Sequence, residues 1–303
     1  MEKEEIKSGY DESESTKSRE KKVYWPRVIE YKQPEAKDER GEVMAKIKNF
    51  LLGIKPREKL QMLEQVYLNN FIYAKTKEQM ELLFNILKAM DAVDRAYFVL
   101  REYRNMAYFD NALPIGFDQT ISQPSTVARM LLLLFDGIWE RRKEKVKFKV
   151  FEVGTGSGWN AALIAYLLSF YFKSYEVHSV DRIEGLVKFA KQNLAKLLAM
   201  QNQKEIKIIK NKIKIAFDDA FEYAKGKKFD YIIFTAGIPN KIIEEKVKAM
   251  ARENLRKDGI LICPETYGEI FIYKKAKHGH SLKLEKTSEA FAFVPLLEGK
   301  IYE

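Results

Sequence analysis

The chain has 303 residues, 46% of them hydrophobic, so it can bury a sizeable core in one or two domains. Its single cysteine, Cys263, excludes an internal disulfide, and no apolar run is long enough for a membrane span, so we expect a soluble, cytoplasmic protein. The net charge of +10 would suit nucleic acid, but acids are interspersed among the lysines, so we favour a solvated surface without nucleic acid as a principal partner.

The N-terminal part differs in composition from the rest. Residues 1–41 are predicted to be a disordered tail and linker, because their first half carries almost no apolar side chains and mixes both charges. Apolar residues then recur at helical spacing on both sides of Pro56, which predicts a helical extension over residues 42–76. We expect this extension to pack on the main domain, residues 77–303, or to mediate self-association.

The main domain opens with an amphipathic helix over residues 77–90 and then becomes irregular. Pro114 and Gly116 interrupt regular structure, and Pro124 can begin a helix, which we predict over residues 126–135. Periodicity alone therefore explains the segment before this helix poorly.

The centre of the chain is a strand, a glycine-rich turn and a helix. An apolar run over residues 147–153 predicts a buried strand, and a long apolar helix follows over residues 161–172. Between them lie glycines at alternate positions, 154, 156 and 158, which allow a sharp turn and close approach to a ligand. The amides of such a turn suit an anionic group, although a glycine-rich turn without a ligand is the plain alternative.

Strands and helices continue to alternate after this turn. Asp181 follows a predicted strand over residues 175–180, where an acid can accept hydrogen bonds from ribose hydroxyls. The further predicted elements are a helix over 183–200, strands over 213–217 and 229–236, a helix over 240–255, a turn at Asp258 and Gly259, a strand over 260–263, and a terminal hairpin formed by 269–274 and a run ending at Val294.

Three stretches resemble the protein-L-isoaspartate (D-aspartate) O-methyltransferase family of class I S-adenosylmethionine-dependent methyltransferases. Residues 113–116, 119–124 and 127–128 match the family's signature loop, residues 153–158 and 160–162 match its cofactor loop, and residues 293–296 match its closing segment. The signature loop is far more specific than the glycines. The resemblance covers the chain from about Lys77 and implies an α/β fold, a doubly wound, mostly parallel seven-stranded Rossmann-like sheet with the N-terminal helical extension added.

The resemblance also implies roles for the matched residues. Ser122 would hydrogen-bond the substrate carboxylate, with Thr120 and Gln119 shaping the same loop; an alternative for Ser122 is to cap the helix at Pro124. Asp110 is either a cap or a contact of this loop. The remaining residues would hold S-adenosyl-L-methionine through its methionyl part (Glu152, Gly154, Thr155, Gly156, Ser157, Gly158), its ribose (Asp181) and its adenine (Asp218), or would wall the substrate pocket (Leu113, Ile115, Val294).

The implied reaction methylates the carboxylate of L-isoaspartyl or D-aspartyl residues in damaged proteins and starts repair through a succinimide. A carboxylate with an ordinary pKa of about 4 is ionised at pH 7, so it is already a nucleophile and needs no general base. Placing it in line with the methyl group and excluding water is then the main task. No metal is expected, since His278 and His280 alone lack the ligand count of a site.

Two other functions stay open. The basic charge and the extension would also suit a methyltransferase of the same fold acting on RNA, or on aspartate of a ribosomally made peptide. A non-catalytic binding module is the second alternative, because Asp219 and residues 265–270 depart from the family pattern. The sequence assigns no oligomeric state.

Overall fold

The computed structural model describes residues 39–141, 147–200, 206–277 and 281–302, which belong to one compact unit. The predicted tail and most of the predicted linker, as well as His278 and His280, lie outside the described residues. The first helix, α1 (Glu39–Leu52), begins three residues before the predicted start of the helical extension.

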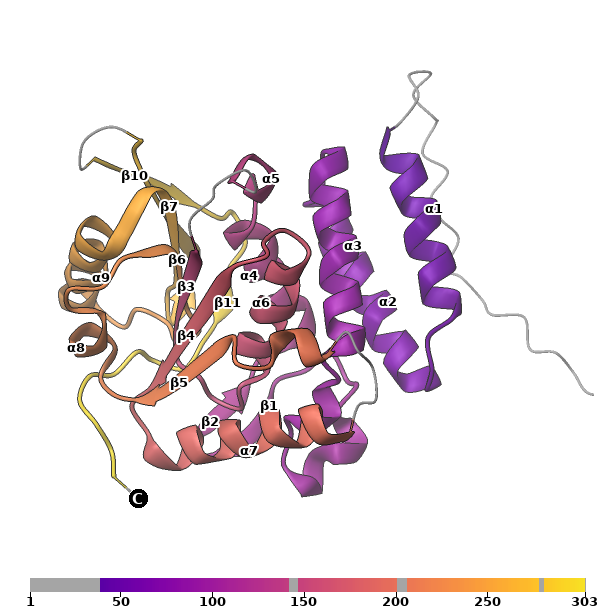
Figure 1. The fold of residues 1–303 in the computed structure, drawn as a ribbon, viewed down its shortest axis with the longest axis horizontal. Helices are drawn as coiled ribbons and strands as arrows, with labels where there is room; N and C mark the ends of the chain where they lie inside the picture. Colours follow the sequence, from indigo (N-terminus) through magenta and orange to yellow (C-terminus); the bar gives the residue numbers. More distant parts are fainter. Residues whose placement is uncertain (1–38, 142–146, 201–205, 278–280, 303) are drawn as a thin grey trace, which may run out of the picture. The chain divides into compact units, whose positions relative to one another are not determined.

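A seven-stranded sheet forms the centre of the described part, which confirms the predicted fold class (Figure 1). Its strands, in spatial order, are β10 (Leu282–Lys286), β9 (Ile270–Lys275), β7 (Leu255–Pro264), β6 (Phe229–Phe234), β3 (Phe148–Val153), β4 (Tyr175–Asp181) and β5 (Ile213–Phe217). The strands from β7 to β5 are parallel, whereas β9 pairs antiparallel with both β7 and β10. From β3 the chain continues to β4 and β5 on one side and later adds β6 and β7 on the other, so the carboxyl ends of β3, β4 and β6 border a crevice.

Helices cover both faces of the sheet (Figure 1). One face packs against α4 (Pro124–Leu134), α6 (Trp159–Ser169) and α7 (Glu184–Met200), and the other against α8 (Ala220–Ala224) and α9 (Lys241–Asn254). The N-terminal helices α1, α2 (Arg57–Phe71) and α3 (Lys77–Ala92) pack outside α4 and α6. The short elements are α5 (Ile138–Arg141), η1 (Arg95–Tyr97), η2 (Arg101–Met106), η3 (Ile206–Ile209) and the two-stranded pairs β1 (Leu113–Gly116) with β2 (Gln119–Ile121) and β8 (Tyr267–Gly268) with β11 (Phe291–Ala292).

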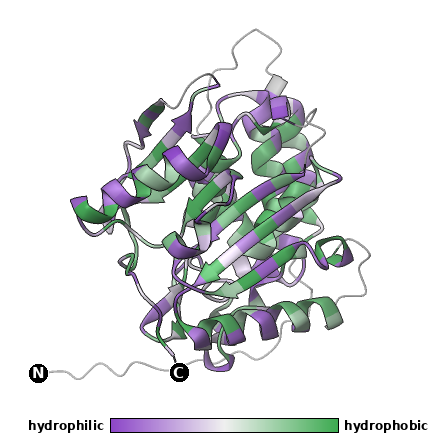
Figure 2. Cartoon of the chain, turned by 60° about the vertical axis from the view of Figure 1, so that its left-hand side comes forward, coloured by the Kyte–Doolittle hydropathy of each residue, from purple (hydrophilic) through white to green (hydrophobic). Residues whose placement is uncertain are grey.

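Local sequence explains how these helices begin and which way they face. The α3 helix begins with a capping box, in which the Thr76 hydroxyl accepts from Gln79 N and the Gln79 side chain accepts from Thr76 N. The α6 helix is apolar all round because it lies between the sheet and α3. In contrast, α7 alternates hydrophobic and hydrophilic residues, as expected for a helix with one solvated side, and it lies at the bottom of Figure 2.

Two predictions near the C-terminus were wrong. The expected turn at Asp258 and Gly259 is a bulge inside β7, where pairing jumps from Phe229↔Leu255 to Tyr231↔Ile260. A Cβ on Gly259 would lie 2.7 Å from two backbone carbonyls, so glycine lets the strand continue through the bulge. In the terminal hairpin, β9 pairs with β10, and the run that ends at Val294 instead pairs with β8 through Phe291 and Ala292.

Asp219, which replaces a glycine of the family pattern, fits its position without strain. Its φ of −71° and ψ of 137° are ordinary extended values, and its side chain caps α8 by accepting from Phe221 N and Glu222 N. Its second carboxylate oxygen accepts from Gly299 N at 2.8 Å, which ties the C-terminal segment to α8.

None of the helices in the described part is both long and apolar enough to cross a membrane.

Candidate active site

A cavity opens at the carboxyl ends of β3, β4 and β6. Four separate segments line it: residues 119–122 with β2, the turn 153–157 after β3, residues 180–183 at the end of β4, and residues 294–297 near the C-terminus. Asp218 and Thr235, which follow β5 and β6, complete the wall. The predicted signature loop and the predicted glycine turn therefore border the same space.

The glycines of the turn adopt backbone conformations that other residues rarely reach. Gly154, Gly156 and Gly158 have φ values of 95°, 53° and 86°. A Cβ on Gly154 would lie 2.3 Å from Thr235 Oγ1, which donates a hydrogen bond to the Gly154 carbonyl at 2.7 Å. Gly154 and Gly156 line the cavity together with Thr155 and Ser157, so a ligand can approach this backbone closely.

Gly158 serves the turn in a different way from the other two glycines. It is the N-cap of α6 and faces α7, where an added Cβ would lie 3.1 Å from the Cβ of Ala190. In the described part of the chain, Gly158 does not line the cavity, whereas the next two residues, Trp159 and Asn160, do. The structure thus places Gly158 at a helix–helix contact behind the turn.

Asp181 lies at the end of β4 with its carboxylate at the cavity wall. Its Oδ2 accepts from Gly156 N at 2.9 Å and its Oδ1 from Ile183 N at 3.0 Å. Burial raises its pKa, and the two backbone amides oppose that change. A carboxylate accepts about four hydrogen bonds, so capacity remains for ligand hydroxyls.

Glu152 is fully buried behind the described residues that line the cavity, and its contact with the methionyl part of the cofactor stays a prediction. Its carboxylate accepts hydrogen bonds from Asn160 Nδ2 at 2.8 Å and from the Ser179 hydroxyl, which also bonds the Thr155 hydroxyl at 2.6 Å. Burial raises the pKa of Glu152 to about 7, although both hydrogen bonds oppose that rise. Glu152 therefore acts on the cavity through Asn160 and Thr155, which do line it.

The loop residues Gln119, Thr120 and Ser122 all line the cavity. Ser122 is not the N-cap of α4; Gln123 holds that position and makes no side-chain capping bond. Asp110 satisfies the helix start instead, because it accepts from Ser125 N at 2.7 Å and from the Ser125 hydroxyl at 2.6 Å. Of the two alternatives for each residue, the structure thus selects the cap for Asp110 and leaves the Ser122 side chain at the cavity.

Only one of the three apolar residues predicted to wall the substrate pocket lines the cavity. Val294 lines it, but Leu113 and Ile115 do not, because alternate residues of β1 point into the protein core. Ile115 packs beneath the glycine turn, with its Cδ1 3.4 Å from the position of a Cβ on Gly156. At the other end of the cavity, Asp218 Oδ1 accepts from Asp219 N at 3.0 Å and lies 3.3 Å from Lys300 Nζ.

Arg95 organises the loop, and the sequence interpretation missed it. Its buried guanidinium donates to four main-chain oxygens of the loop, those of Ala107, Phe109, Asn111 and Ser122, at 2.8–3.2 Å. It also lies over the Trp159 ring, 5.4 Å from its centroid, and Trp159 Nε1 donates to Val93 O at 2.9 Å. Burial lowers the Arg95 pKa to about 10, so it stays charged at neutral pH.

Arg95 therefore links the loop with Ser122 to the helix that follows the glycine turn. The available signal was the pair of charged residues, Asp94 and Arg95, inside the otherwise apolar run of residues 92–99. In the described part of the chain, no group of three histidine, cysteine or acidic side chains is arranged to hold a metal ion.

Comparisons with known proteins agree with this geometry. Residues 68–301 match the family model described as Protein-L-isoaspartate(D-aspartate) O-methyltransferase (PCMT). The chain is 34% identical over 213 residues to the protein-L-isoaspartate O-methyltransferase of Thermosipho melanesiensis, covering 70% of this chain and 94% of the relative. It is 34% identical over 238 residues to that of Pyrococcus abyssi, covering 75% of this chain and 96% of the relative.

A solved structure of a Plasmodium falciparum protein described as a protein-L-isoaspartate O-methyltransferase, in complex with S-adenosyl-L-homocysteine, has the same fold. The TM-score is 0.57 at 20% identity, and the match covers 80% of this chain and 99% of that chain. The helices α1 and most of α2 precede the family match.

Proposed function

The chain belongs to the protein-L-isoaspartate(D-aspartate) O-methyltransferase family, and we propose that it transfers a methyl group from S-adenosyl-L-methionine to the carboxylate of L-isoaspartyl or D-aspartyl residues in proteins. The observation that carries the proposal is the single cavity shared by the glycine turn and the loop with Ser122. Methyl transfer needs both reactants in one enclosed space, because the oxygen must approach the methyl carbon in line with the bond that breaks.

The residues of the cavity fit S-adenosyl-L-methionine. The glycine turn offers a cradle that a Cβ would fill, and Asp181 retains acceptor capacity for ribose hydroxyls. Asn160 Oδ1 is buried and, within the described residues, has no hydrogen-bond partner, so it can accept a bond from the methionyl ammonium. When bound, the cofactor supplies an activated methyl group on its sulfonium.

The chain itself orients the substrate and keeps water out. The Ser122 hydroxyl donates to the substrate carboxylate, and Gln119 and Thr120 shape the loop around it. Val294 and Leu296 provide apolar surface in the lining of the same cavity. Since the substrate carboxylate is ionised at neutral pH, no residue has to remove a proton. The resulting methyl ester has a better leaving group than the free acid. The neighbouring backbone amide nitrogen therefore attacks the ester carbonyl and expels methanol without the enzyme, and hydrolysis of the succinimide returns some normal aspartate.

A comparison of acceptors tests the proposal. The protein is incubated with radiolabelled S-adenosyl-L-methionine and, separately, with an isoaspartyl peptide, its normal aspartyl twin and tRNA. Labelling of the isoaspartyl peptide alone is expected. Labelling of tRNA alone would contradict the proposal in favour of an RNA methyltransferase, and cofactor binding without labelling of any acceptor would favour a binding module.

A further inference from the structure

We propose that helix α2 holds the substrate loop, residues 107–125, in its binding geometry, and that Lys59 and Asn69 are the positioning residues. The proposal rests on the proposed function, because it assigns that loop to the substrate. The family match begins only at residue 68, so Lys59 belongs to a part of this chain that the family model does not include.

Lys59 is a buried cation that reaches across from α2 to the start of the loop region. Only 6% of the residue is exposed, and its Nζ lies 2.9 Å from Asp91 Oδ1, 2.7 Å from Asp91 O and 3.2 Å from Asp94 Oδ2. Asp91 and Asp94 flank the end of α3. A buried ammonium must be paired to be tolerated, and Lys59 in turn neutralises two carboxylates that would otherwise repel each other.

Asp94 transmits this contact to the loop at two points. Its Oδ1 accepts from Ala96 N at 2.9 Å and so caps the turn that carries Arg95, which binds four main-chain oxygens of the loop. The Tyr108 hydroxyl, which belongs to the loop, donates to both Asp94 oxygens at 2.9 and 3.0 Å. If position 59 carries no cation, the Asp94 carboxylate can regain a polar environment only by moving toward water. Tyr108 and Arg95, which depend on Asp94, would then move with it.

The other end of α2 holds the end of the loop. Asn69 Nδ2 donates to Asp110 Oδ2 at 3.2 Å and to the Ser125 hydroxyl at 3.0 Å, while the adjacent Asn70 Nδ2 donates to Ser125 O at 3.1 Å. Asp110 and Ser125 form the capping contact at the start of α4, three residues after Ser122. One helix therefore contacts both the anchor of Arg95 and the cap next to Ser122, which fixes the loop from two sides.

The closing experiment measures loop order and substrate use in the full chain. In Lys59→Met, hydrogen exchange of the amides in residues 107–125 is expected to accelerate at least tenfold. For an isoaspartyl peptide, the KM should rise and the kcat should fall, together lowering kcat/KM about tenfold, while the Kd for S-adenosyl-L-homocysteine stays within about twofold. The double variant Lys59→Met/Asp94→Asn removes the less exposed of the two carboxylates that lose their cation, leaves the more exposed Asp91 and keeps an acceptor for Ala96 N, so it should recover most of the lost activity and protection.

Lys46→Met is the matched control, because Lys46 pairs with Glu81 at 3.5 Å and joins the same extension to α3 away from the loop.

At the other end of α2, Asn69→Asp places a carboxylate beside Asp110, and Asp110→Asn in the same chain should relieve that repulsion. Equal loop exchange in Lys59→Met and Lys46→Met would overturn the proposal. Hydrogen exchange does not depend on turnover, so it tests the role of α2 even if the wild-type protein methylates no isoaspartyl peptide. Such a lack of methylation would contradict the proposed function but not the role of α2 in holding the loop.

Discussion

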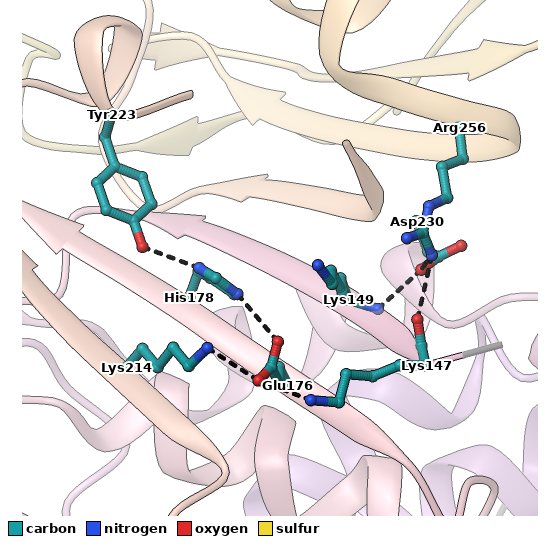
Figure 3. Close-up of polar contacts among 8 residues, drawn as sticks. All are labelled: Lys147, Lys149, Glu176, His178, Lys214, Tyr223, Asp230 and Arg256. Carbon is teal, nitrogen blue, oxygen red and sulfur yellow. Dashed lines mark hydrogen bonds and ion pairs between the residues drawn. The ribbon is translucent and has the colours of Figure 1, made fainter. Parts of the chain in front are cut away.

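Buried or half-buried carboxylates lie at both edges of the parallel sheet, but their partners differ. At the carboxyl edge, Glu152 and Asp181 accept hydrogen bonds from a hydroxyl, an amide side chain and backbone amides, and burial raises the pKa of each. At the amino edge, Lys147 and Lys214 converge on Glu176 at 2.8 and 2.9 Å, and the hydrogen bond from Lys147 is the main cause that lowers its pKa to about 2 (Figure 3).

Asp230 completes the amino edge (Figure 3). It accepts from Arg141 at 2.9 Å, from Arg256 at 2.8 Å and from Lys149 N at 2.7 Å, and it is fully buried. Cations at this edge cancel the charge of the carboxylates and join neighbouring strands. Neutral donors around Glu152 and Asp181 orient these two carboxylates without cancelling their charge, which leaves Asp181 at the cavity wall available to a ligand. We therefore infer that the amino edge serves stability and the carboxyl edge serves binding.

The largest expected effect is a loss of stability at the amino edge. Asp230→Ala leaves Arg141 and Arg256 without their shared carboxylate, and removing one partner of a buried ion pair costs about 3–5 kcal/mol. Urea denaturation should show this loss, while the folded variant retains wild-type affinity for S-adenosyl-L-homocysteine. Glu222→Ala is the control, since its pair with Lys225 is exposed and should not change the midpoint. A large loss of affinity in the folded Asp230 variant would break the division between the two edges.

The carboxyl edge should show the reverse pattern. Asp181→Asn keeps the size of the side chain but removes the charge, and its amide cannot accept from both backbone N–H groups and two ribose hydroxyls. We expect the affinity for S-adenosyl-L-homocysteine to fall about 100-fold, equivalent to about 2.7 kcal/mol. Isothermal titration calorimetry measures this change, with Glu176→Gln as the amino-edge control. Unchanged affinity in Asp181→Asn would place the ribose elsewhere.

Local patterns predicted the centre of the carboxyl edge well. Buried parallel strands give uninterrupted apolar runs, so the strands that became β3, β4 and β6 were visible in the sequence. Gly154, Gly156 and Asp181 follow directly after such runs, and their positions at the cavity required no long-range information. The family resemblance supplied the loop with Ser122, which periodicity did not explain.

The residues that join these segments were not predictable in the same way. Arg95 binds main-chain oxygens 12 to 27 residues away, and any residue type supplies such an acceptor. Asp110 caps a helix that begins 14 residues later, outside the local spacing of capping motifs. At the C-terminus, the bulge at Asp258 and the pairing of β9 with β10 depend on neighbouring strands rather than on local sequence.

A smaller effect distinguishes the two halves of the cavity itself. Ser122→Ala removes one hydrogen bond to the substrate carboxylate, so turnover of an isoaspartyl peptide should fall about tenfold, the loss of one good hydrogen bond. The affinity for S-adenosyl-L-homocysteine should stay within about twofold, because Asp181 and the glycine turn are unchanged. Steady-state kinetics and calorimetry on one preparation check both values. Loss of cofactor affinity instead would show that Ser122 belongs to the cofactor half.

The smallest effect concerns the charge of Glu152. Its folded pKa of about 7 lies above the ordinary 4.5, so the folded protein retains a proton that the unfolded chain releases. The protonated Glu152 carboxyl therefore makes its full contribution to the stability of the folded protein below pH 4.5, and this contribution is lost as the pH rises to about 7. If S-adenosyl-L-methionine binds in the cavity that Asn160 and Thr155 line, its positive charge would favour the ionised carboxylate, so binding should release a proton near pH 7.

The affinity for S-adenosyl-L-methionine should accordingly rise between about pH 6 and 8, by up to about tenfold for a pKa lowered by about one unit. S-adenosyl-L-homocysteine, which has a neutral sulfur, should show a weaker dependence, and Glu152→Gln should abolish the difference between the two ligands. Calorimetry in buffers of different ionisation enthalpy counts the released protons directly. Equal proton release in wild type and Glu152→Gln would assign the titration to another group.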